Sequence, residues 1–347
     1  MDKRKIKNTI ALICFMGILL YGAYGNEKKE IPKQIYIGVA CYDQRDTFLG
    51  ELLETFKGEC RTLEEKEYDI SLTIMDAANS QRTQDDQVQE MINNGCDILC
   101  VNLADRTDPS QIITAAQEHD IPIIFFNREP VEEDLRQWDQ LYYVGAKAKQ
   151  SGQMQGQLAA DYIKENPDVD RNHDGKIQYV ILEGEMGHQD AIIRTESVVE
   201  SLKNQGIELE KLSYQIANWN RAQAQNRMMQ IIGQYKSQIE VVLANNDAMA
   251  LGAMDAYEKL GYTESNWPVF FGIDGTKEGL EAVEDKTLAA TVYNDKEGQA
   301  VAMANLAFSI VTEDENNPNP FKNYKYIYLP YQKVTSENVQ MFLEKEE

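Results

Sequence analysis

Short apolar runs alternate with amphipathic stretches along most of the chain. Ile35–Ala40 has the length and composition of a buried strand, and the apolar residues from Phe48 to Phe56 then fall on one face of a helix. Strands that alternate with helices of ten to fifteen residues predict βαβ units and a parallel sheet. Further strands of this first unit are expected at 71–75, 98–102 and 121–127, and a short strand at 142–144 starts the next alternation.

The same alternation begins again in the second half of the chain. Strands are expected at 177–182, 241–245, 269–274, 288–293 and 326–329, and helices at 191–204, 222–235, 248–260, 277–285 and 297–312. A chain of 347 residues is long enough for two domains. The pattern therefore predicts an α/β protein of two doubly wound parallel-sheet lobes.

The N-terminal segment differs from the rest. Four cations in the first seven residues precede an apolar run over 10–22, and Ala23–Gly25 then offers small residues for cleavage. We expect an exported protein, with residues 1–25 as a signal peptide or an N-terminal anchor and 26–33 as a linker. Cys14 follows Ile13, where a lipoprotein signal would have a small residue, so lipidation is disfavoured.

The net charge of the chain limits the kinds of molecule it is expected to bind. The chain has 34 Lys and Arg against 57 Asp and Glu, a formal net charge of −23. So much negative charge argues against nucleic acid and against an anionic membrane surface. The composition fits a soluble protein that binds a neutral ligand.

Four cysteines remain beyond the N-terminal segment: Cys41, Cys60, Cys96 and Cys100. Their spacing suggests no metal site, and they lie on or beside expected strands. We expect buried free thiols. A disulfide between Cys41 and Cys100 is the alternative if their strands are neighbours.

A calcium-binding loop is predicted over 170–178. Oxygen-bearing side chains occupy positions 1, 3, 5 and 9 of an EF-hand pattern, Gly175 permits the turn at position 6, and position 7 offers a backbone carbonyl. Position 12 is Ile181, so a distant carboxylate must complete the site. The expected Ca²⁺ ligands are Asp170, Asn172, Asp174, Lys176 (backbone), Gln178 and Glu240.

Polar residues follow many of the expected strands, where ligands collect in open parallel sheets. Asp190 and Arg194 share one face of a helix, and planar groups of this kind bind adjacent sugar hydroxyls. The apolar face of a pyranose stacks on aromatic rings, for which Phe48 and Trp219 are candidates.

Several motifs together resemble the periplasmic galactose/glucose-binding proteins, the substrate receptors of ABC sugar importers and of chemotaxis. The resemblance extends from about residue 35 to about 342. It is carried by the calcium loop and by Asp46-Thr47-Phe48, Phe126-Asn127-Arg128-Glu129-Pro130, Gly187-His188-Gln189-Asp190, Ala244-Asn245-Asn246-Asp247 and Phe271-Gly272-Ile273-Asp274.

The resemblance implies a type I periplasmic-binding-protein fold that closes on galactose or glucose as a monomer. Its lobes would comprise 34–143 plus 295–325 and 144–294 plus 326–347. The sugar-binding residues it implies are Asp46, Phe48, Asn102, His188, Asp190, Arg194, Trp219, Asn246, Asp274 and Asn294.

The implied partner is an ABC permease, with a chemoreceptor as a further possibility. An anchored co-sensor that signals to a sensor kinase stays open as the alternative. An enzyme that acts on a sugar through His188 and Asp190 is disfavoured, because no phosphate loop, nucleophile motif or catalytic metal triad accompanies them.

Overall fold

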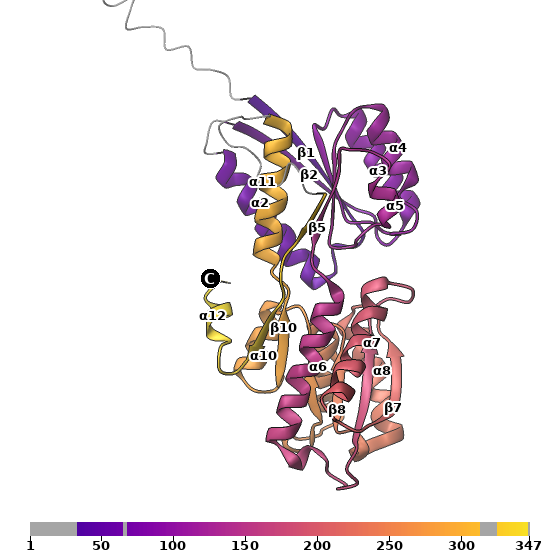
Figure 1. Ribbon diagram of the computed structural model, residues 1–347, viewed down its shortest axis with the longest axis vertical. Helices are drawn as coiled ribbons and strands as arrows, with labels where there is room; N and C mark the ends of the chain where they lie inside the picture. The colour runs from indigo at the N-terminus through magenta and orange to yellow at the C-terminus, as the bar shows by residue number, and fades with distance from the viewer. Residues whose placement is uncertain (1–32, 65–67, 313–324, 346–347) are drawn as a thin grey trace, which may run out of the picture.

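Two α/β lobes lie one above the other along the long axis of the molecule (Figure 1). The computed structural model describes residues 33–64, 68–312 and 325–345, so the expected signal or anchor and most of the linker lie outside the described residues. Each lobe is built on a six-stranded sheet, which confirms the predicted fold class. None of the helices in these ranges is both long and apolar enough to span a membrane.

The N-terminal lobe has a parallel sheet in the order β11-β5-β4-β3-β1-β2. Its central strands are short and buried along their length, as expected for a sheet covered on both faces. Its strands are β1 (Lys33–Cys41), β2 (Tyr68–Asp76), β3 (Ile98–Val101), β4 (Ile123–Phe126), β5 (Leu141–Gly145) and β11 (Tyr326–Tyr328).

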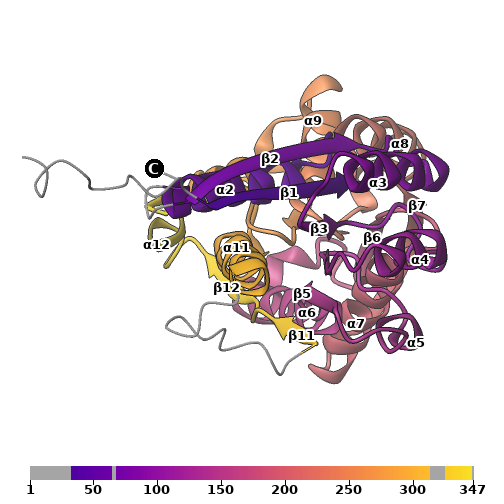
Figure 2. The same ribbon diagram turned by 90° about the horizontal axis from the view of Figure 1, so that it is seen from above.

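Helices cover both faces of this sheet. Figure 2 shows α3, α4 and α5 on one side and α11 on the other, and two apolar clusters fill the spaces between helices and sheet. The predicted apolar face of the first helix is buried through Phe48, Leu52 and Phe56. The helices of this lobe are α2 (Thr47–Glu64), α3 (Gln81–Asn93), α4 (Ser110–Glu118), α5 (Glu132–Leu135) and α11 (Lys296–Thr312).

The C-terminal lobe repeats the plan in the order β12-β10-β9-β8-β6-β7. Only its edge strand β12 is antiparallel to its neighbour. The strands are β6 (Ile177–Glu183), β7 (Leu209–Ile216), β8 (Val241–Ala244), β9 (Val269–Phe271), β10 (Ala290–Tyr293) and β12 (Gln332–Thr335).

This second sheet also separates two apolar clusters. Helices α6 and α7 pack on one face, and α8, α9, α10 and α12 on the other. Their bounds are α6 (Ala148–Glu165), α7 (Gln189–Asn204), α8 (Arg221–Tyr235), α9 (Asp247–Lys259), α10 (Lys277–Glu284) and α12 (Gln340–Leu343), with 3₁₀ turns at Pro167–Val169, Lys236–Gln238 and Glu264–Asn266.

The chain crosses between the lobes after β5, after β10 and after β11. The third crossover corrects one expected boundary, because 326–328 was placed in the C-terminal lobe. Tyr326 pairs with Tyr143 in the N-terminal sheet, and Tyr328 packs its ring 5.7 Å from the Tyr143 ring. This aromatic packing holds β11 in the first lobe, and the chain enters the second lobe only before β12.

The four cysteines expected to be thiols are free and buried. Strands β1 and β3 are neighbours, which was the condition for a disulfide. Their register sets Cys100 opposite Val39 rather than Cys41. Burial raises the pKa of the Cys41 thiol to about 12, so it is an unreactive core residue.

Candidate functional site

A pocket lies between the lobes, lined by residues that follow the carboxyl ends of strands in both sheets. Its inner part, which we call the inner pocket, has a volume of about 30 Å³. Both lobes contribute to its walls, so movement of one lobe against the other changes its size. The inner pocket is lined by Tyr42, Asp46, Phe48, Asn127, Arg128, His188, Asp190, Arg194, Trp219, Asn246 and Asp274.

The start of α2 supplies Asp46 and Phe48 from the N-terminal lobe. Asp46 caps the helix, since its Oδ1 accepts a hydrogen bond from the Leu49 N–H at 2.9 Å. Its Oδ2 accepts from the Tyr42 hydroxyl at 2.5 Å. The cap fixes the carboxylate at the mouth of the pocket, and Phe48 presents an aromatic ring beside it.

The structure places Asn127, rather than Asn102, on the pocket wall. Asn102 is fully buried behind it and donates from Nδ2 to the Phe126 carbonyl at 3.0 Å and to Asn127 Oδ1 at 3.1 Å. Asn127 has a φ of 58°, which turns the chain sharply after β4. The expected ligand Asn102 is thus a support for Asn127.

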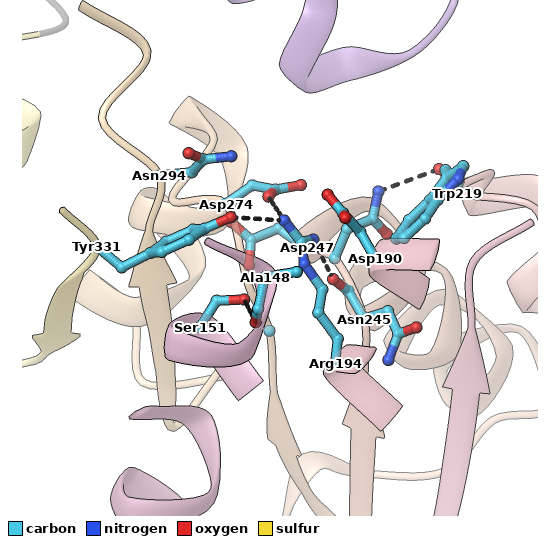
Figure 3. Close-up of polar contacts among 12 residues, drawn as sticks. Ala148, Ser151, Asp190, Arg194, Trp219, Asn245, Asp247, Asp274, Asn294 and Tyr331 are labelled. Carbon is cyan, nitrogen blue, oxygen red and sulfur yellow. Dashed lines mark hydrogen bonds and ion pairs between the residues drawn. The ribbon is translucent and has the colours of Figure 1, made fainter. Parts of the chain in front are cut away.

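Arg194 is the central cation of the pocket (Figure 3). It is buried on α7, and its guanidinium donates to the Asn245 carbonyl at 2.7 Å and to the Tyr331 hydroxyl at 3.1 Å. Asp274 Oδ1 lies 3.2 Å from Arg194 Nη2. Nearby acidic and phenolic oxygens raise the pKa of Arg194 against the effect of burial, so it stays charged.

His188 and Asp190 lie at the N-terminus of α7. His188 caps the helix, with Nδ1 accepting from the Asp190 N–H at 3.1 Å. This bond assigns the ring proton to Nε2, which can donate to a ligand. Burial and the neighbouring Arg128 lower the pKa of His188, so the ring is neutral, and burial raises the pKa of Asp190.

Trp219 is held in an unusual backbone conformation. It has a φ of 60° and follows Asn218 with a φ of 52°, both in the left-handed region. The indole ring lies against Gly184, where a Cβ would be 2.2 Å from Trp219 Cζ2. Only glycine therefore allows the ring to lie there. The His188 ring packs edge-on against the indole, with 5.3 Å between the ring centroids.

The remaining expected sugar ligands come from three strand ends. Asn246 caps α9 and donates from Nδ2 to the Trp219 carbonyl at 3.3 Å. Asn294 accepts at Oδ1 from Gln299 Nε2 at 2.8 Å, and its N–H bonds the Asp274 carbonyl. Burial raises the pKa of Asp274 to about 7, although Arg194 opposes the shift.

Asp247 is a second buried acid, which the sequence did not single out as a ligand. It is fully buried, and Oδ1 accepts from the Thr291 hydroxyl at 2.6 Å while Oδ2 accepts from the Thr276 N–H at 2.9 Å. Burial, and then the charge of Asp274, raise its pKa to about 8. The sequence showed that Asp247 directly follows Asn246 at the end of a strand. It did not show that the Asp247 side chain is directed inward.

A larger outer cavity of about 340 Å³ adjoins the inner pocket. The two share Tyr42, Asp46 and Trp219. The other walls of the outer cavity come from both lobes and are polar: Asp43, Arg45, Asn79, Glu185, Asn218, Asn220 and Gln223.

Two sets of contacts join the lobes across the cleft. Arg128 is buried, stacks on the Tyr42 ring at 3.5 Å and pairs with Glu185 of the C-terminal lobe at 2.7 Å. On α2, Glu51 accepts from the Lys277 N–H of the other lobe at 3.1 Å and pairs with the buried Lys296 at 2.5 Å. The lobes are therefore in contact on both sides of the cleft.

The predicted calcium loop precedes β6, at the edge of the sheet away from the cleft. Glu240 reaches it as expected, because β8 lies beside β6. Glu240 accepts at Oε1 from the Arg171 N–H at 2.7 Å and at Oε2 from the Gln178 N–H at 2.9 Å.

The loop side chains also contact one another. Asp170 accepts from the Gly175 N–H at 2.9 Å, and Asn172 and Gln178 both donate to Asp174. Burial raises the pKa of Glu240, and the charge of Asp170 adds to this, so a cation here would be favoured. Across the described residues, no group of three His, Cys, Asp or Glu forms a metal site by itself, so amide and carbonyl oxygens would have to contribute.

Comparison with known proteins identifies the family. Residues 37–315 match the model of a periplasmic binding protein domain. The chain is 34% identical over 325 residues to the D-galactose/methyl-galactoside binding periplasmic protein MglB of Haemophilus influenzae, covering 92% of this chain and 96% of that one. It is 29% identical to a putative rhizopine-binding protein of Rhizobium meliloti, covering 79% of this chain and 82% of the relative.

Solved structures have the same architecture. An ABC transporter solute binding protein from Bacillus halodurans, with bound myo-inositol, superposes with a TM-score of 0.75 at 27% identity and covers 91% of this chain and 100% of its own. A protein from Actinobacillus succinogenes with bound D-allose gives 0.75 at 19% identity, which supports the fold alone; it covers 88% of this chain and 99% of its own. These relatives are solute-binding proteins and not enzymes, and the chain belongs to the periplasmic binding protein family.

Proposed function

We propose that this protein binds a neutral hexose, D-galactose or D-glucose, between its lobes outside the cytoplasmic membrane. The observation that carries the proposal is the composition of the inner pocket. Phe48 from one lobe and Trp219 from the other provide aromatic faces, and planar polar groups line the walls between them. A pyranose has apolar C–H faces and a rim of hydroxyls that suit such walls.

The charges of the pocket favour a neutral ligand. Arg194 is already balanced by Asp274 at 3.2 Å and by the nearby Asp190. An anionic sugar would meet these two carboxyls, and a cationic one would meet Arg194. Hydroxyl groups both donate and accept, so they bond to carboxylate, amide and guanidinium groups without adding charge.

The relatives support a polyhydroxylated ring as the ligand. The Haemophilus influenzae relative is named for D-galactose and methyl-galactoside, and the Bacillus halodurans structure holds myo-inositol. The 34% identity over most of both chains favours the galactose type.

An ABC importer is the proposed recipient of the sugar, through a permease that recognises the closed form. Closure would bury the ligand from both lobes, and the ligand shifts the lobes toward that form. Co-purification from membranes tests the partner. Recovery of importer subunits supports delivery, whereas recovery of a sensor kinase or chemoreceptor would assign the protein to signalling.

The binding test is a titration of the purified protein with galactose, glucose and ribose, followed by tryptophan fluorescence. We expect saturable responses to at least one of the two hexoses and a weaker one to ribose. Trp219→Phe should remove most of the signal, while Trp138→Phe, far from the pocket in the N-terminal lobe, should keep it. Absence of a saturable response to both hexoses would refute the proposal.

We further propose that the loop 170–178 and Glu240 hold a structural Ca²⁺. Support comes from the oxygen ligands at alternate loop positions and from Glu240, which lies beside the loop with both oxygens directed at it. The ion would tie the start of β6 to β8 and stabilise the C-terminal lobe.

A further inference from the structure

We propose that the N-terminal lobe binds a second copy of this chain through strand β2, so that the two β2 strands pair antiparallel and join the two sheets into one. This dimer goes beyond sugar binding, and it departs from the monomer that the resemblance implied. Strand β2 is the last strand of its sheet, and Figure 2 shows it outside β1. Within the described ranges, no strand pairs with its outer side. An open strand edge of this kind can pair with another chain.

The other three sheet edges that the structure describes are protected against such pairing. Strand β11 has only three residues, and β12 has four and includes Lys333. Strand β7 has eight residues, but it carries Glu210 and Lys211, and its register with β6 skips Leu212. Short strands, lysines and bulges are the features by which natural proteins keep sheet edges from associating.

Strand β2 has none of these features. It is nine residues long, and it pairs with β1 from end to end without a shift of register. It contains no Lys, Arg, Pro or Gly, and its two acids, Asp69 and Asp76, lie near its ends. The uncharged stretch 70–75 between them has two isoleucines, a leucine and a threonine, a composition typical of a strand paired on both sides.

An apolar groove runs beside β2 on the face of the sheet that α2 covers. It has a volume of about 390 Å³, and Ile70, Leu72 and Ile74 line it from the strand while α2 forms the other wall. Leu72 and Ile74 are only half-buried, although they pack against the apolar cluster of the lobe. Apolar side chains of a paired strand would cover this row and remove its exposed surface from water, which favours association.

The apolar residues of β2 match one another when two copies run antiparallel. A two-fold axis at Leu72 sets the two Leu72 side chains opposite each other and sets Ile70 opposite Ile74 of the other copy. All these side chains lie on the same face of the joined sheet, because they alternate along the strand. Cross-strand pairs of branched apolar side chains stabilise a sheet.

The polar residues of β2 match in the same register. Ser71 lies opposite Thr73 of the other copy, and hydroxyl pairs of this kind can hydrogen-bond across two strands. Asp69 and Asp76 each lie opposite an uncharged residue, so no like charges face each other. The strand is therefore complementary to itself in both polarity and charge, which favours a second copy over an unrelated strand as the occupant.

Sedimentation equilibrium of the purified protein tests the dimer at concentrations from about 1 to about 500 μM, because mass action raises the dimer population with concentration. We expect the average mass to rise toward that of two chains. Ser71→Lys adds a charge at an exposed position of the edge, so it should weaken dimerisation at least tenfold and leave the melting temperature unchanged. Ser213→Lys makes the same change on the edge strand β7 and should dimerise as the wild type does.

Oxidative cross-linking tests the register. Leu72→Cys places two thiols opposite each other in the dimer, with Cβ atoms about 5 Å apart, so an intermolecular disulfide should form. Ile74→Cys is the control on the same face, because its two copies would lie about 13 Å apart along the strands. The native cysteines in the described part of the chain are buried, so they should not compete.

A protein that stays monomeric at every concentration would overturn the proposal. So would a dimer that Ser71→Lys leaves unchanged, or one in which Ile74→Cys cross-links as readily as Leu72→Cys, because the contact would then lie on another surface or in another register. Neither measurement involves hexose binding, so failure of the dimer leaves the proposed function untouched.

Discussion

The position of Trp219 depends on Gly184, which has no side chain of its own in the pocket. A Cβ at Gly184 would be 2.2 Å from Cζ2 and 2.3 Å from Cε2 of the indole. These are rigid ring atoms on a residue whose backbone is already in the left-handed region, so the ring cannot move slightly to make room. The ring itself must leave its place.

Gly184→Ala should therefore weaken hexose binding at least tenfold, about 1.4 kcal/mol, without removing a polar ligand. Calorimetry with the preferred hexose measures this. Gly233→Ala is the matched control, because a Cβ there meets nothing within 4 Å in the helix α8. It should leave affinity unchanged and add about 0.5–1 kcal/mol of stability. Unchanged affinity in Gly184→Ala would contradict the assigned position of the ring.

Asp247 predicts a dependence of stability on pH. Its folded pKa of about 8 lies above the value near 4 of an unfolded aspartate, so the folded protein binds more protons between these values. The linked stability is present at acidic pH and is lost as the pH rises through about 8. Asp274, with a pKa of about 7, acts in the same direction.

The variant Asp247→Asn should reduce that dependence. An asparagine can keep accepting from the Thr276 N–H, and its amide nitrogen can donate to the Thr291 hydroxyl once that hydroxyl, now a donor to Asp247, rotates to accept. The melting temperature of the wild type should be several degrees lower at pH 8.5 than at pH 5.5. The variant should show less than half of that difference. The exposed Asp161→Asn should behave as wild type. An equal fall in Asp247→Asn would show that this acid does not titrate there.

The sequence indicated residue types at strand ends but not the direction of each side chain. Asn102 and Asn127 are both asparagines after buried strands, and only the turn at Asn127, with φ of 58°, brings its amide to the pocket wall. Asn246 and Asp247 are adjacent, yet one lines the pocket and the other is buried behind it. Backbone direction at a turn depends on tertiary packing, which periodicity does not contain.

Among the elements, the buried strands were predictable, but both edge strands of the C-terminal sheet were missed. Strands such as β3 and β8 are buried at every residue, so their apolar runs stand out in the sequence. Strand β7 was missed because it lies at a sheet edge and includes Glu210, Lys211 and Gln215. Strand β12 was missed for the same reason, since Gln332 and Lys333 interrupt any apolar run.

The calcium proposal is tested at the level of the loop and its two strands. A chelator should lower the melting temperature of the wild type by several degrees, because an ion bound only to the folded state stabilises it. Glu240→Gln should melt lower with calcium present and lose most of the chelator effect. Hexose affinity measured at low temperature should change little, because the loop lies at the opposite edge of the sheet from the cleft.

Glu200→Gln is the control for that experiment, because Glu200 is exposed on α7. It should keep the full response to the chelator. A wild-type melting temperature that is the same with calcium and with chelator would contradict the proposed site.

At the scale of the whole molecule, the three crossovers allow the lobes to move, and the contacts across the cleft favour the closed arrangement. The Arg128–Glu185 pair is the most direct of these, with Arg128 held in place by the Tyr42 ring and by the Ala104 carbonyl at 3.0 Å. The side chain of Glu185, the other partner of the pair, is about one-third exposed. Solvent screening limits such a pair to about 1 kcal/mol or less.

Weakening this pair should lower the population of the closed form, and apparent affinity falls in proportion to that population. Glu185→Gln keeps an acceptor for Arg128 but removes the charge, and Glu185→Ala removes both. Hexose Kd should rise about 2- to 5-fold in the first, in line with the limit on an exposed pair, and further in the second.

Small-angle scattering links this loss to the lobes. Without sugar, the radius of gyration of Glu185→Gln should exceed that of the wild type, and saturating hexose should bring both to the same value. Glu196→Gln, exposed on the same helix α7, should match the wild type in both measurements. If the variants lose affinity with no change in the radius of gyration of the free protein, Glu185 acts on the ligand directly and not on closure. Equal affinity in all four proteins would show that the pair contributes nothing to the closed form, and the contact of Glu51 with the Lys277 N–H would then be the one that holds the lobes together.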